Sequence, residues 1–361
     1  MQTNRLWLWA FSGCYAVAAA LYCATVLTPP AYGDLTRLGR LSEHAFGWHA
    51  TQPAIDPALL RSWPLNEADV VVIGDSFSVA VGRYGGDVQL VWQSALGQAG
   101  HRVTTLHFDD VGPLCPDLPL WLAAQGFRGR WVLIESVERN LSELMRRASA
   151  CTAMKTKSTG MAYTRPSPRI AAPERTLNWL APITTGAVTA WNTARALHAE
   201  SVLVTGPAEA VRIQRVEGGC KLFSHEACDR ALFLEHDSTS AAFALESVQR
   251  LQQFNAARSD LQIVWVIVPN KSTVYLSSSG SADVARILAR GGLGPDLFGA
   301  LAAQRKQQVD LYAPNDTHLS TAGSLFMGQQ IAVWLTQRDV EEASAKRTPS
   351  PGSALNPKNR L

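Results

Sequence analysis

A serine stands where a strongly apolar run of the sequence ends. Residues 70–73 are Val-Val-Val-Ile, which is typical of a buried strand, and Gly74, Asp75 and Ser76 follow directly. A serine at the end of a strand can act as a nucleophile when a neighbouring base removes its proton. Ser76 can equally cap a following helix, because serine is a favoured residue at that position. The motif therefore needs a partner base before it indicates catalysis.

A base and an orienting acid are found near the other end of the chain. The segment 311–323, LYAPNDTHLSTAG, contains Asp316 and His318. In an extended segment, residues two apart point the same way, so the Asp316 carboxylate can hold the His318 ring and fix its tautomer. The other ring nitrogen then faces a serine, as in a hydrolytic triad. The alternative is an exposed loop without a role. Together the two motifs predict Ser76 as nucleophile, His318 as base and Asp316 as orienting acid.

Alternating strands and helices are predicted around these motifs. Apolar strand patterns occupy 68–74, 101–108, 130–136 and 261–270, and helical patterns occupy 88–100, 137–148, 294–308 and 320–337. Continuously apolar strands that alternate with helices indicate an α/β fold with a central parallel sheet covered on both faces. In such sheets ligands bind beyond the carboxyl ends of the strands, which is where Ser76 stands.

The remaining segments give the domain organisation. Residues 1–5 form a short tail, 6–27 an apolar span, 28–66 a polar connector, 67–338 the catalytic domain and 339–361 a polar tail expected to be disordered. Two insertions interrupt the catalytic domain. Residues 154–182, rich in Thr, Ser and Pro, are expected to form a surface loop, and residues 202–237 a hairpin closed by a disulfide.

Residues 6–27 contain no charged side chain and suffice to cross a bilayer. Trp7 and Trp9 stand at the edge of this span, where interfacial aromatic residues are common. The length favours an uncleaved transmembrane helix over a signal peptide, although the small residues at 31–33 leave cleavage open. The few flanking charges, Arg5 before the span and Arg37 after it, leave the orientation open.

Four cysteines lie outside the span: Cys115, Cys151, Cys220 and Cys228. They lack the paired spacing of a zinc site, and an even number predicts disulfides in an oxidising compartment. The sequence-local pairing, Cys115 with Cys151 and Cys220 with Cys228, is one of three possible pairings, and unpaired buried thiols are the alternative. With the span, the cysteines predict a domain outside the cytoplasm.

Charge and histidine content exclude other classes of partner. The net charge is only +3, and no basic stripe alternates with aromatic residues, so a nucleic-acid partner is not expected. His49, His107, His225 and His236 show no metal-ligand spacing with the acids, so no metal site is predicted.

Taken together, the Gly-Asp-Ser and Asp-x-His motifs resemble the SGNH/GDSL hydrolase superfamily, in which an early Gly-Asp-Ser supplies the nucleophile and a late Asp and His complete the triad. The resemblance implies a flavodoxin-like three-layer sandwich. Asp-Thr-His, where most of the superfamily has Asp-x-x-His, is similar to the alginate O-acetyltransferase group. Residues 132–141 and 264–275 are similar to the Glu-Arg and Pro-x-Lys-x-x-x-Tyr blocks of that group. The order of the four blocks differs, so the chain resembles a permuted relative or a separate branch.

The resemblance implies an O-acetyltransferase that moves acetyl groups through acyl-Ser76 onto hydroxyls of an exported polysaccharide. It also implies a membrane-bound O-acyltransferase as acetyl-donor partner, no cofactor, and a single-pass protein of the bacterial inner membrane with its catalytic domain in the periplasm. Two alternatives stay open: a carbohydrate esterase or deacetylase with the same triad, and a non-catalytic polysaccharide-binding or assembly protein.

The donors of an oxyanion hole are less clear from the sequence. The backbone amide of Ser76 is one candidate. Asp75 beside it, and Arg139 and Asn140 after the strand at 130–136, are further candidates for the oxyanion hole or for substrate contacts, although Arg139 and Asn140 can also simply begin a helix. Lys271 can bind an anionic substrate or cap the end of a strand.

Overall fold

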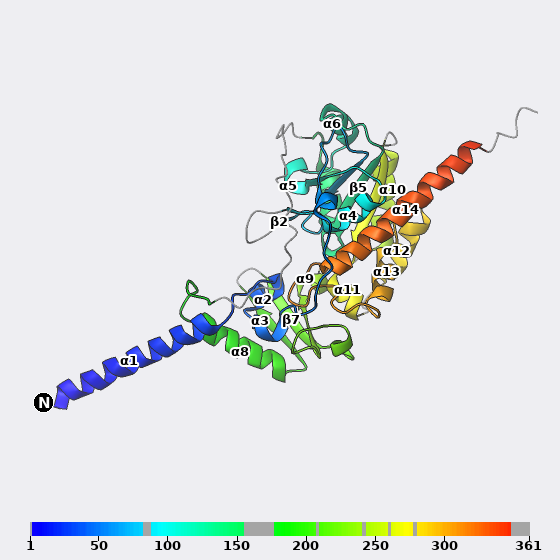
Figure 1. The fold of residues 1–361 in the computed structure, drawn as a ribbon. Helices are drawn as coiled ribbons and strands as arrows, with labels where there is room; N and C mark the ends of the chain where they lie inside the picture. Colours follow the sequence, from blue (N-terminus) through cyan, green and yellow to red (C-terminus); the bar gives the residue numbers. More distant parts are fainter. Residues whose placement is uncertain are drawn as a thin grey trace, which may run out of the picture.

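A four-stranded parallel sheet lies at the centre of the computed structural model (Figure 1). The structure describes residues 2–81, 88–154, 177–206, 209–239, 243–258, 261–276 and 280–347. The strands of the sheet, in spatial order, are β4 (Val103–His107), β1 (Val70–Gly74), β5 (Trp131–Val137) and β9 (Gln262–Val268). All three pairings are parallel. The predicted α/β class and central parallel sheet are confirmed.

The order of these strands places a topological switch point between β1 and β5. The chain runs from β1 to β4 on one side and then returns to β5 on the other side of β1. At such a switch point the connections leave the sheet in opposite directions, and ligands of α/β proteins bind there, beyond the carboxyl ends of the strands. Ser76 follows β1, and Asn140 lies shortly after β5.

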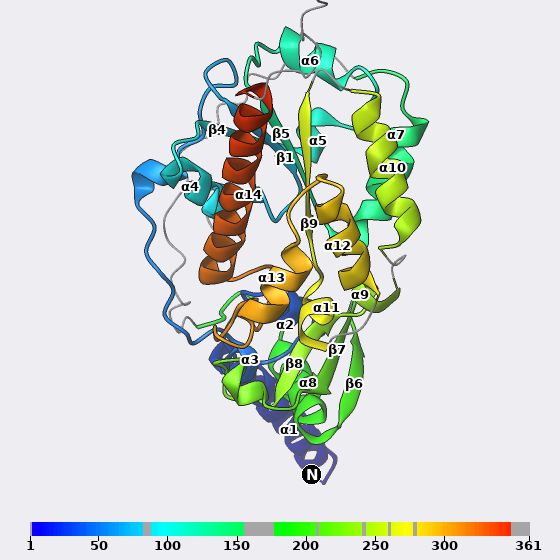
Figure 2. The ribbon, with the colours of Figure 1, turned by 90° about the vertical axis from the view of Figure 1, so that its right-hand side faces the viewer.

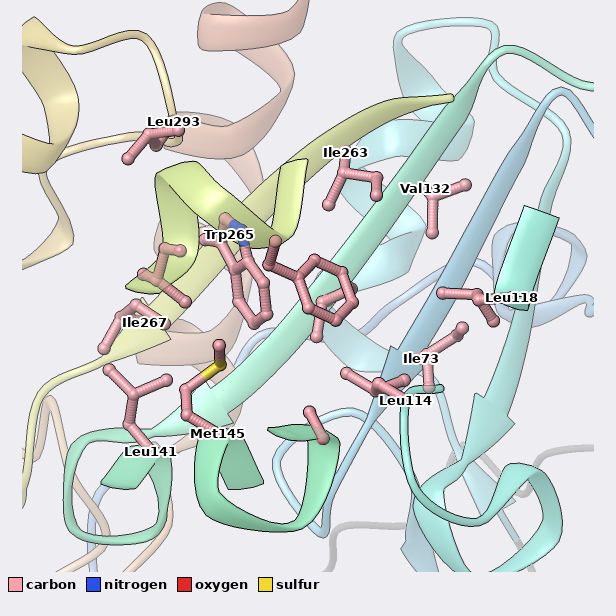
Figure 3. Packing of buried hydrophobic residues seen from close by; sticks show 14 of the residues in the cluster. Ile73, Leu114, Leu118, Val132, Leu141, Met145, Ile263, Trp265, Ile267 and Leu293 are labelled. Atoms are coloured by element: carbon pink, nitrogen blue, oxygen red, sulfur yellow. The ribbon is translucent and has the colours of Figure 1, made fainter. Parts of the chain in front are cut away.

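Side chains alternate between the two faces of the sheet, and each face packs against its own helices (Figure 2). One face carries Ile73, Ile134 and Trp265 and packs against α6 (Leu118–Ala124), α7 (Leu141–Ala150), α10 (Leu245–Ala256) and α12 (Ser281–Arg290), as Figure 3 shows in part. The other face packs against α4 (Val91–Gln98), α13 (Leu297–Gln304) and α14 (Thr321–Arg347). Burial of both faces explains the continuously apolar strands.

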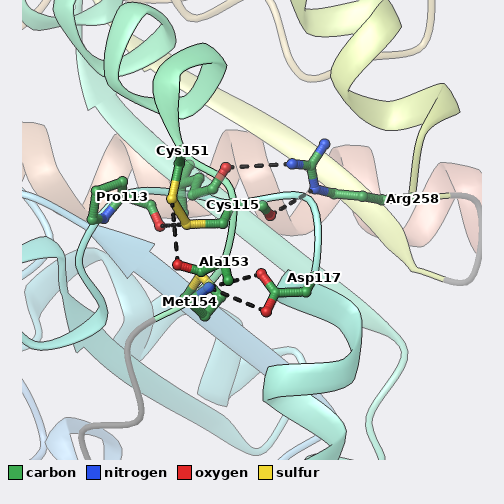
Figure 4. Close-up of a disulfide and its surroundings, with 8 residues drawn as sticks. Pro113, Cys115, Asp117, Cys151, Ala153, Met154 and Arg258 are labelled. Carbon is green, nitrogen blue, oxygen red and sulfur yellow. Dashed lines mark hydrogen bonds between the residues drawn. A yellow bond between two sulfur atoms is a disulfide. The ribbon is translucent and has the colours of Figure 1, made fainter.

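A second, antiparallel sheet is formed by β6 (Ser201–Thr205), β7 (Ala210–Arg215) and β8 (Arg230–Leu234). The predicted hairpin at 202–237 is thus three strands instead of two. The disulfide Cys220–Cys228 closes the connection between β7 and β8. The disulfide Cys115–Cys151 ties the chain before α6 to the end of α7. Beside it, Arg258 donates one hydrogen bond to the backbone carbonyl of Cys115 and one to that of Leu114 (Figure 4). Both predicted pairings are present.

The segment predicted as a polar connector, residues 28–66, is folded: its first part packs against this second sheet, and its last part lies against α4 and β4 of the central domain. It contains α2 (Asp34–Gly39), α3 (Glu43–Phe46) and the 3-10 turn η1 (Pro57–Leu60). Leu35, Leu41 and Phe46 are buried in one cluster with side chains of β7 and β8. The expectation of a polar connector overlooked these apolar residues, which are scattered among polar ones.

The N-terminal helix α1 (Gln2–Leu27) is long and apolar enough to cross a membrane, as a signal sequence would also be. Its last turn packs against α8 (Thr185–His198), because the Thr25 hydroxyl donates to the Ile183 carbonyl and accepts from the Gly186 amide. Of the predicted surface loop at 154–182, residues 155–176 lie outside the described part of the chain.

The last helix extends beyond its expected end. α14 continues to Arg347, so the prediction that the chain is disordered from 339 onward is wrong for residues 339–347. Arg130 holds this part through ion pairs with Asp339 and Glu342. Residues 348–361 of that tail are outside the described range.

The remaining elements are short. They are β2 (Ala80–Val81), β3 (Val88–Gln89), α5 (Phe108–Val111), η2 (Glu138–Asn140), η3 (Gly219–Lys221), α9 (His236–Thr239) and α11 (Lys271–Leu276).

Candidate functional site

The three residues of the predicted triad lie together at the carboxyl edge of the parallel sheet. His318 Nε2 is 2.8 Å from Ser76 Oγ, and His318 Nδ1 is 2.6 Å from Asp316 Oδ1. The Asp316 carboxylate also accepts the backbone amide of His318 at 3.1 Å. Because Nδ1 donates to a carboxylate, Nε2 carries the lone pair and can accept the serine proton. This is the hydrogen-bonded order that nucleophilic catalysis requires.

The imidazole is held from two further sides. The Phe77 ring packs against the His318 ring with centroids 4.6 Å apart. Asp34 Oδ2 lies 3.7 Å from His318 Nδ1, so a second carboxylate stands beside the nitrogen that carries the proton. Both carboxylates can stabilise the imidazolium that forms once His318 has taken the serine proton.

Ser76 lies in a tight turn, residues 74–78, which we call the nucleophile turn. Asp75 closes this turn: its Oδ1 accepts the Phe77 amide at 2.9 Å, and its Oδ2 accepts the Val137 amide at 3.3 Å. The second bond joins the end of β1 to the end of β5. Asp75 therefore shapes the turn that presents Ser76, whose side chain is exposed to solvent.

A buried glutamate lies beneath the nucleophile turn. Glu135 Oε2 accepts the Asp75 amide at 3.0 Å and the Ser78 hydroxyl at 2.8 Å. Gly74 leaves the room for this pair, because a Cβ there would collide with both Ser78 and Glu135. Burial, reinforced by the charge of Asp75, raises the pKa of Glu135 well above its usual range. The folded environment therefore favours the neutral acid of Glu135 over its carboxylate.

The oxyanion and substrate candidates that follow β5 differ in accessibility. The exposed Asn140 side chain lies beside the nucleophile turn, with its Nδ2 3.5 Å from Asp75 Oδ2. Arg139 is mostly buried, and its Nη1 is 3.2 Å from the buried carboxylate of Asp237. The Arg139 guanidinium also lies 6.0 Å from the centroid of the Phe77 ring. Asn140 is thus placed as a possible oxyanion donor, whereas Arg139 serves mainly as an internal ion-pair partner.

Lys271 does not fit the predicted role in substrate binding. Its side chain is fully buried, and its Nζ donates to the carbonyls of Ala313, Pro314 and Asp316 at 2.9, 2.8 and 3.1 Å. These carbonyls belong to residues 313–318, the loop that carries the acid and the base and that we call the base loop. Lys271 therefore fixes the base loop from inside. Burial lowers the pKa of Lys271 to about 7, against the opposing effect of Asp316.

Residues 33–43, which follow α1, support the base loop from its other side. Asp34 donates its backbone amide to Asp316 Oδ2 at 3.0 Å, and Leu35 donates its amide to the Asn315 carbonyl at 2.9 Å. The Asn315 side chain donates to the buried carboxylate of Glu43. Gly33 lies against Asn315 so closely that any side chain there would collide with it.

Within the described residues, one group of three acids and histidines could surround a cation: Asp34, Asp316 and His318. The atoms that would bind the cation all lie within 4.8 Å of one another. Their hydrogen bonds already pair these atoms. His318 Nδ1 and Asp316 Oδ1 share a proton at 2.6 Å, which a metal ion at that place would have to displace. We therefore interpret the group as the acid and base of the triad.

Sequence reasoning missed the residues that support the triad. Asp34 and Glu43 stand in the segment that was taken for a connector, and their link to Asp316 depends on contacts far apart in the sequence. Glu135 did carry a signal, because an ionisable residue inside the apolar run 131–137 has to be buried.

No family model, no curated protein and no solved structure matches this chain. The likeness of its motifs to a known superfamily therefore stays a prediction from short blocks of sequence. The fold and the geometry of the site are established by the structure alone.

Proposed function

We propose that this protein is a membrane-anchored, extracytoplasmic O-acetyltransferase that moves acetyl groups through acyl-Ser76 onto hydroxyls of an exported polysaccharide. The observation that carries the proposal is the continuous hydrogen-bonded order of Ser76 Oγ, His318 Nε2, His318 Nδ1 and Asp316 Oδ1. A protein that had lost catalytic activity would not need to keep Ser76 and His318, 242 positions apart in the sequence, in hydrogen-bonding contact.

In the first half of the reaction, Ser76 Oγ attacks the carbonyl carbon of an acetyl donor. His318 Nε2 takes the serine proton as the new bond forms, and Asp316 stabilises the resulting imidazolium. The bond between the acetyl carbon and the donor's leaving atom then breaks, and the proton passes from His318 to that atom. The backbone amide of Ser76 and the Asn140 side chain are the proposed donors to the oxyanion.

In the second half, a sugar hydroxyl attacks the acyl-serine. His318 accepts the hydroxyl proton, the new ester forms, and the bond between acetyl and Ser76 Oγ breaks. Ser76 Oγ recovers its proton from His318. The cycle returns the protein to its starting state and needs no cofactor or redox step.

The position of the site relative to α1 supports a donor presented at a membrane. Thr25 lies in the last turn of α1, and Asp34 donates its backbone amide to Asp316. The chain between Thr25 and Asp34 can span at most about 30 Å. With α1 in a bilayer, the triad lies close to its surface. A membrane-bound O-acyltransferase as the donor partner agrees with this placement, and the two disulfides agree with a periplasmic domain.

An esterase with the same triad is the second candidate, and the exposure of Ser76 favours it. Water can reach the acyl-serine in the structure and can replace the sugar hydroxyl in the second half-reaction. The difference between the two functions lies only in which acceptor the site prefers.

The proposal is tested by incubating the full chain in detergent with a chromogenic acetyl ester, with and without uronic-acid or neutral oligosaccharides. We expect acetylated oligosaccharide, detected by mass spectrometry, and none with Ser76→Ala. Release of acetate to water alone, unchanged by any oligosaccharide, would support the esterase and contradict the transferase.

A further inference from the structure

An apolar surface segment, residues 177–183, lies directly beside the end of α1. Its sequence is Leu-Asn-Trp-Leu-Ala-Pro-Ile. The Leu180 side chain is 99% exposed and that of Trp179 is 58% exposed, and Leu177 and Ile183 are also exposed. Large apolar side chains gathered on a surface mark a binding surface more often than chance exposure.

The 177–183 segment is fixed to the last turn of α1 by two hydrogen bonds, and Gly186 of α8 adds a third bond to the same turn. Asn178 donates its backbone amide to the Val26 carbonyl at 3.0 Å. Thr25 donates its hydroxyl to the Ile183 carbonyl at 2.7 Å and accepts the Gly186 amide at 3.0 Å. The segment therefore sits at the level of residues 25–26, at the end of the apolar helix.

The exposed length of α1 indicates where a bilayer surface would lie. Side chains from Leu6 to Ala24 are largely exposed, whereas Thr25 and Val26 are buried against the domain. At 1.5 Å per residue, the part from Leu6 to Ala24 is about 28 Å long, close to the roughly 30 Å of a bilayer's hydrocarbon core. The membrane surface would then meet the protein at the 177–183 segment.

The charge pattern fits the same location. No charged residue occurs between Arg175 and Arg195, although the described part of this stretch includes many exposed residues, among them Trp191 of α8. Exposed tryptophan and leucine in a segment without charged side chains are typical of the interfacial layer of a bilayer. A water-facing surface of this size would be expected to carry charges.

We infer that the 177–183 segment is a membrane-contact element that inserts Trp179 and Leu180 into the lipid interface beside α1. The domain is then held to the bilayer at two adjacent places, the helix and this segment. Two attachments restrict rotation and tilting of the domain about α1 and so keep the triad at a fixed height above the lipid. This inference extends beyond the proposed reaction and does not depend on it.

The experiment uses the full chain in phospholipid vesicles that contain no other protein. Leu180→Cys is made in a Cys14→Ser, Cys23→Ser background, because these two cysteines are free, and is labelled with an environment-sensitive fluorophore. Trp179→Cys is a second probe. Leu120→Cys is the matched control, since Leu120 is 74% exposed on α6, at the end of the molecule away from α1 (Figure 1).

We expect acyl-chain-brominated lipid to quench the label at 180 and at 179 at least about twofold more than the label at 120. Equal quenching at 180, 179 and 120 would overturn the inference and would favour a protein partner on this surface. Failure of the chain to float with the vesicles would overturn it as well, because α1 would then not be an anchor. Neither result bears on whether Ser76 is acylated, so this test and that of the proposed reaction fail independently.

Discussion

The two halves of the candidate site are built in different ways. The nucleophile turn follows β1 and is held by groups on the neighbouring strand β5: Asp75 bonds to Val137, and Glu135 bonds to Asp75 and Ser78. The base loop lies outside the sheet and is held by groups from distant segments, Lys271 and residues 33–43. The nucleophile is therefore part of the rigid core, whereas the acid and base depend on supports that other segments supply.

This difference indicates where the site is vulnerable. A change beneath the nucleophile turn acts through a buried, tightly packed strand end, so it should mainly alter stability. A change in the supports of the base loop should shift His318 relative to Ser76 and mainly alter catalysis. The following variants test that distinction, from the largest expected effect to the smallest.

Removal of either half of the triad should abolish activity equally. Ser76→Ala and His318→Ala should each lower kcat for ester turnover on the order of 10⁴–10⁶-fold, because nucleophile and base act as one unit. Ser201→Ala and His198→Ala, at exposed positions away from the site, are the controls. A Ser76→Ala protein within about tenfold of wild-type turnover would show that another nucleophile does the chemistry.

Loss of the internal support of the base loop should be the next largest effect. Lys271→Met leaves three carbonyls without their donor, and a shift of about 1 Å in His318 is expected to lower kcat about 10²-fold with little change in KM. Thermal unfolding in detergent, compared with the exposed-site variant Lys306→Met, shows whether the protein is folded. A folded Lys271→Met protein with unchanged kcat would mean that the base loop keeps its position without the hydrogen bonds from Lys271.

Displacement of the segment after α1 should have a smaller effect. Gly33→Ala places a methyl group against Asn315 and should move the base loop slightly, with about a tenfold lower kcat. Gly280→Ala, where an added Cβ meets no neighbour, should leave kcat unchanged. Equal turnover of both variants would argue that residues 33–43 do not position the base.

The two regions should respond to pH with opposite signs. Lys271 has a pKa of about 7 in the folded protein, below its ordinary value of 10.5. Between pH 7 and pH 10.5, Lys271 therefore carries a proton in the unfolded chain but not in the folded protein. The free energy of unfolding should therefore rise with pH from about 7 to 10.5 because of Lys271. The Lys271→Met protein should lack this rise. The slope is at most about 1.4 kcal/mol per pH unit.

Glu135 should give the reverse dependence. Its raised pKa means that the folded state keeps a proton that the unfolded chain releases above about pH 4.5. The contribution of Glu135 to stability is complete below that pH and is lost as pH rises towards the folded pKa. Glu135→Gln should remove this loss, so its stability relative to wild type should increase as the pH rises above about 4.5, read from thermal midpoints. Parallel pH curves for the two proteins would mean that Glu135 is ionised in the folded state.

The sequence predicted those parts of the molecule that depend on local pattern. The run 70–73 indicated a buried strand, and the position of Ser76 at its end followed from that. The two disulfides, which link cysteines near one another in the chain, were also among the predicted pairings. The strand pattern is local, and each disulfide joins cysteines that follow one another in the order of the four, so periodicity and spacing contain the information.

The supports of the base loop could not be predicted, because they arise from contacts between distant segments. Asp34 and Asp316 are 282 residues apart, and Lys271 reaches the carbonyl of Ala313 from another element. A buried lysine has the same sequence signal as one that binds a substrate, so the sequence left both roles open for Lys271. Residues 339–347 were polar enough to suggest disorder, but ion pairs with Arg130 hold them in α14.

The central claim is that Ser76 becomes acylated, and mass spectrometry of the acid-quenched protein after brief mixing with an acetyl ester tests it most directly. We predict a single added acetyl group on the peptide that contains Ser76, lost on incubation with an acceptor and absent from Ser76→Ala. Turnover without any acetyl group on that peptide, or with one on another residue that persists in Ser76→Ala, would contradict the account.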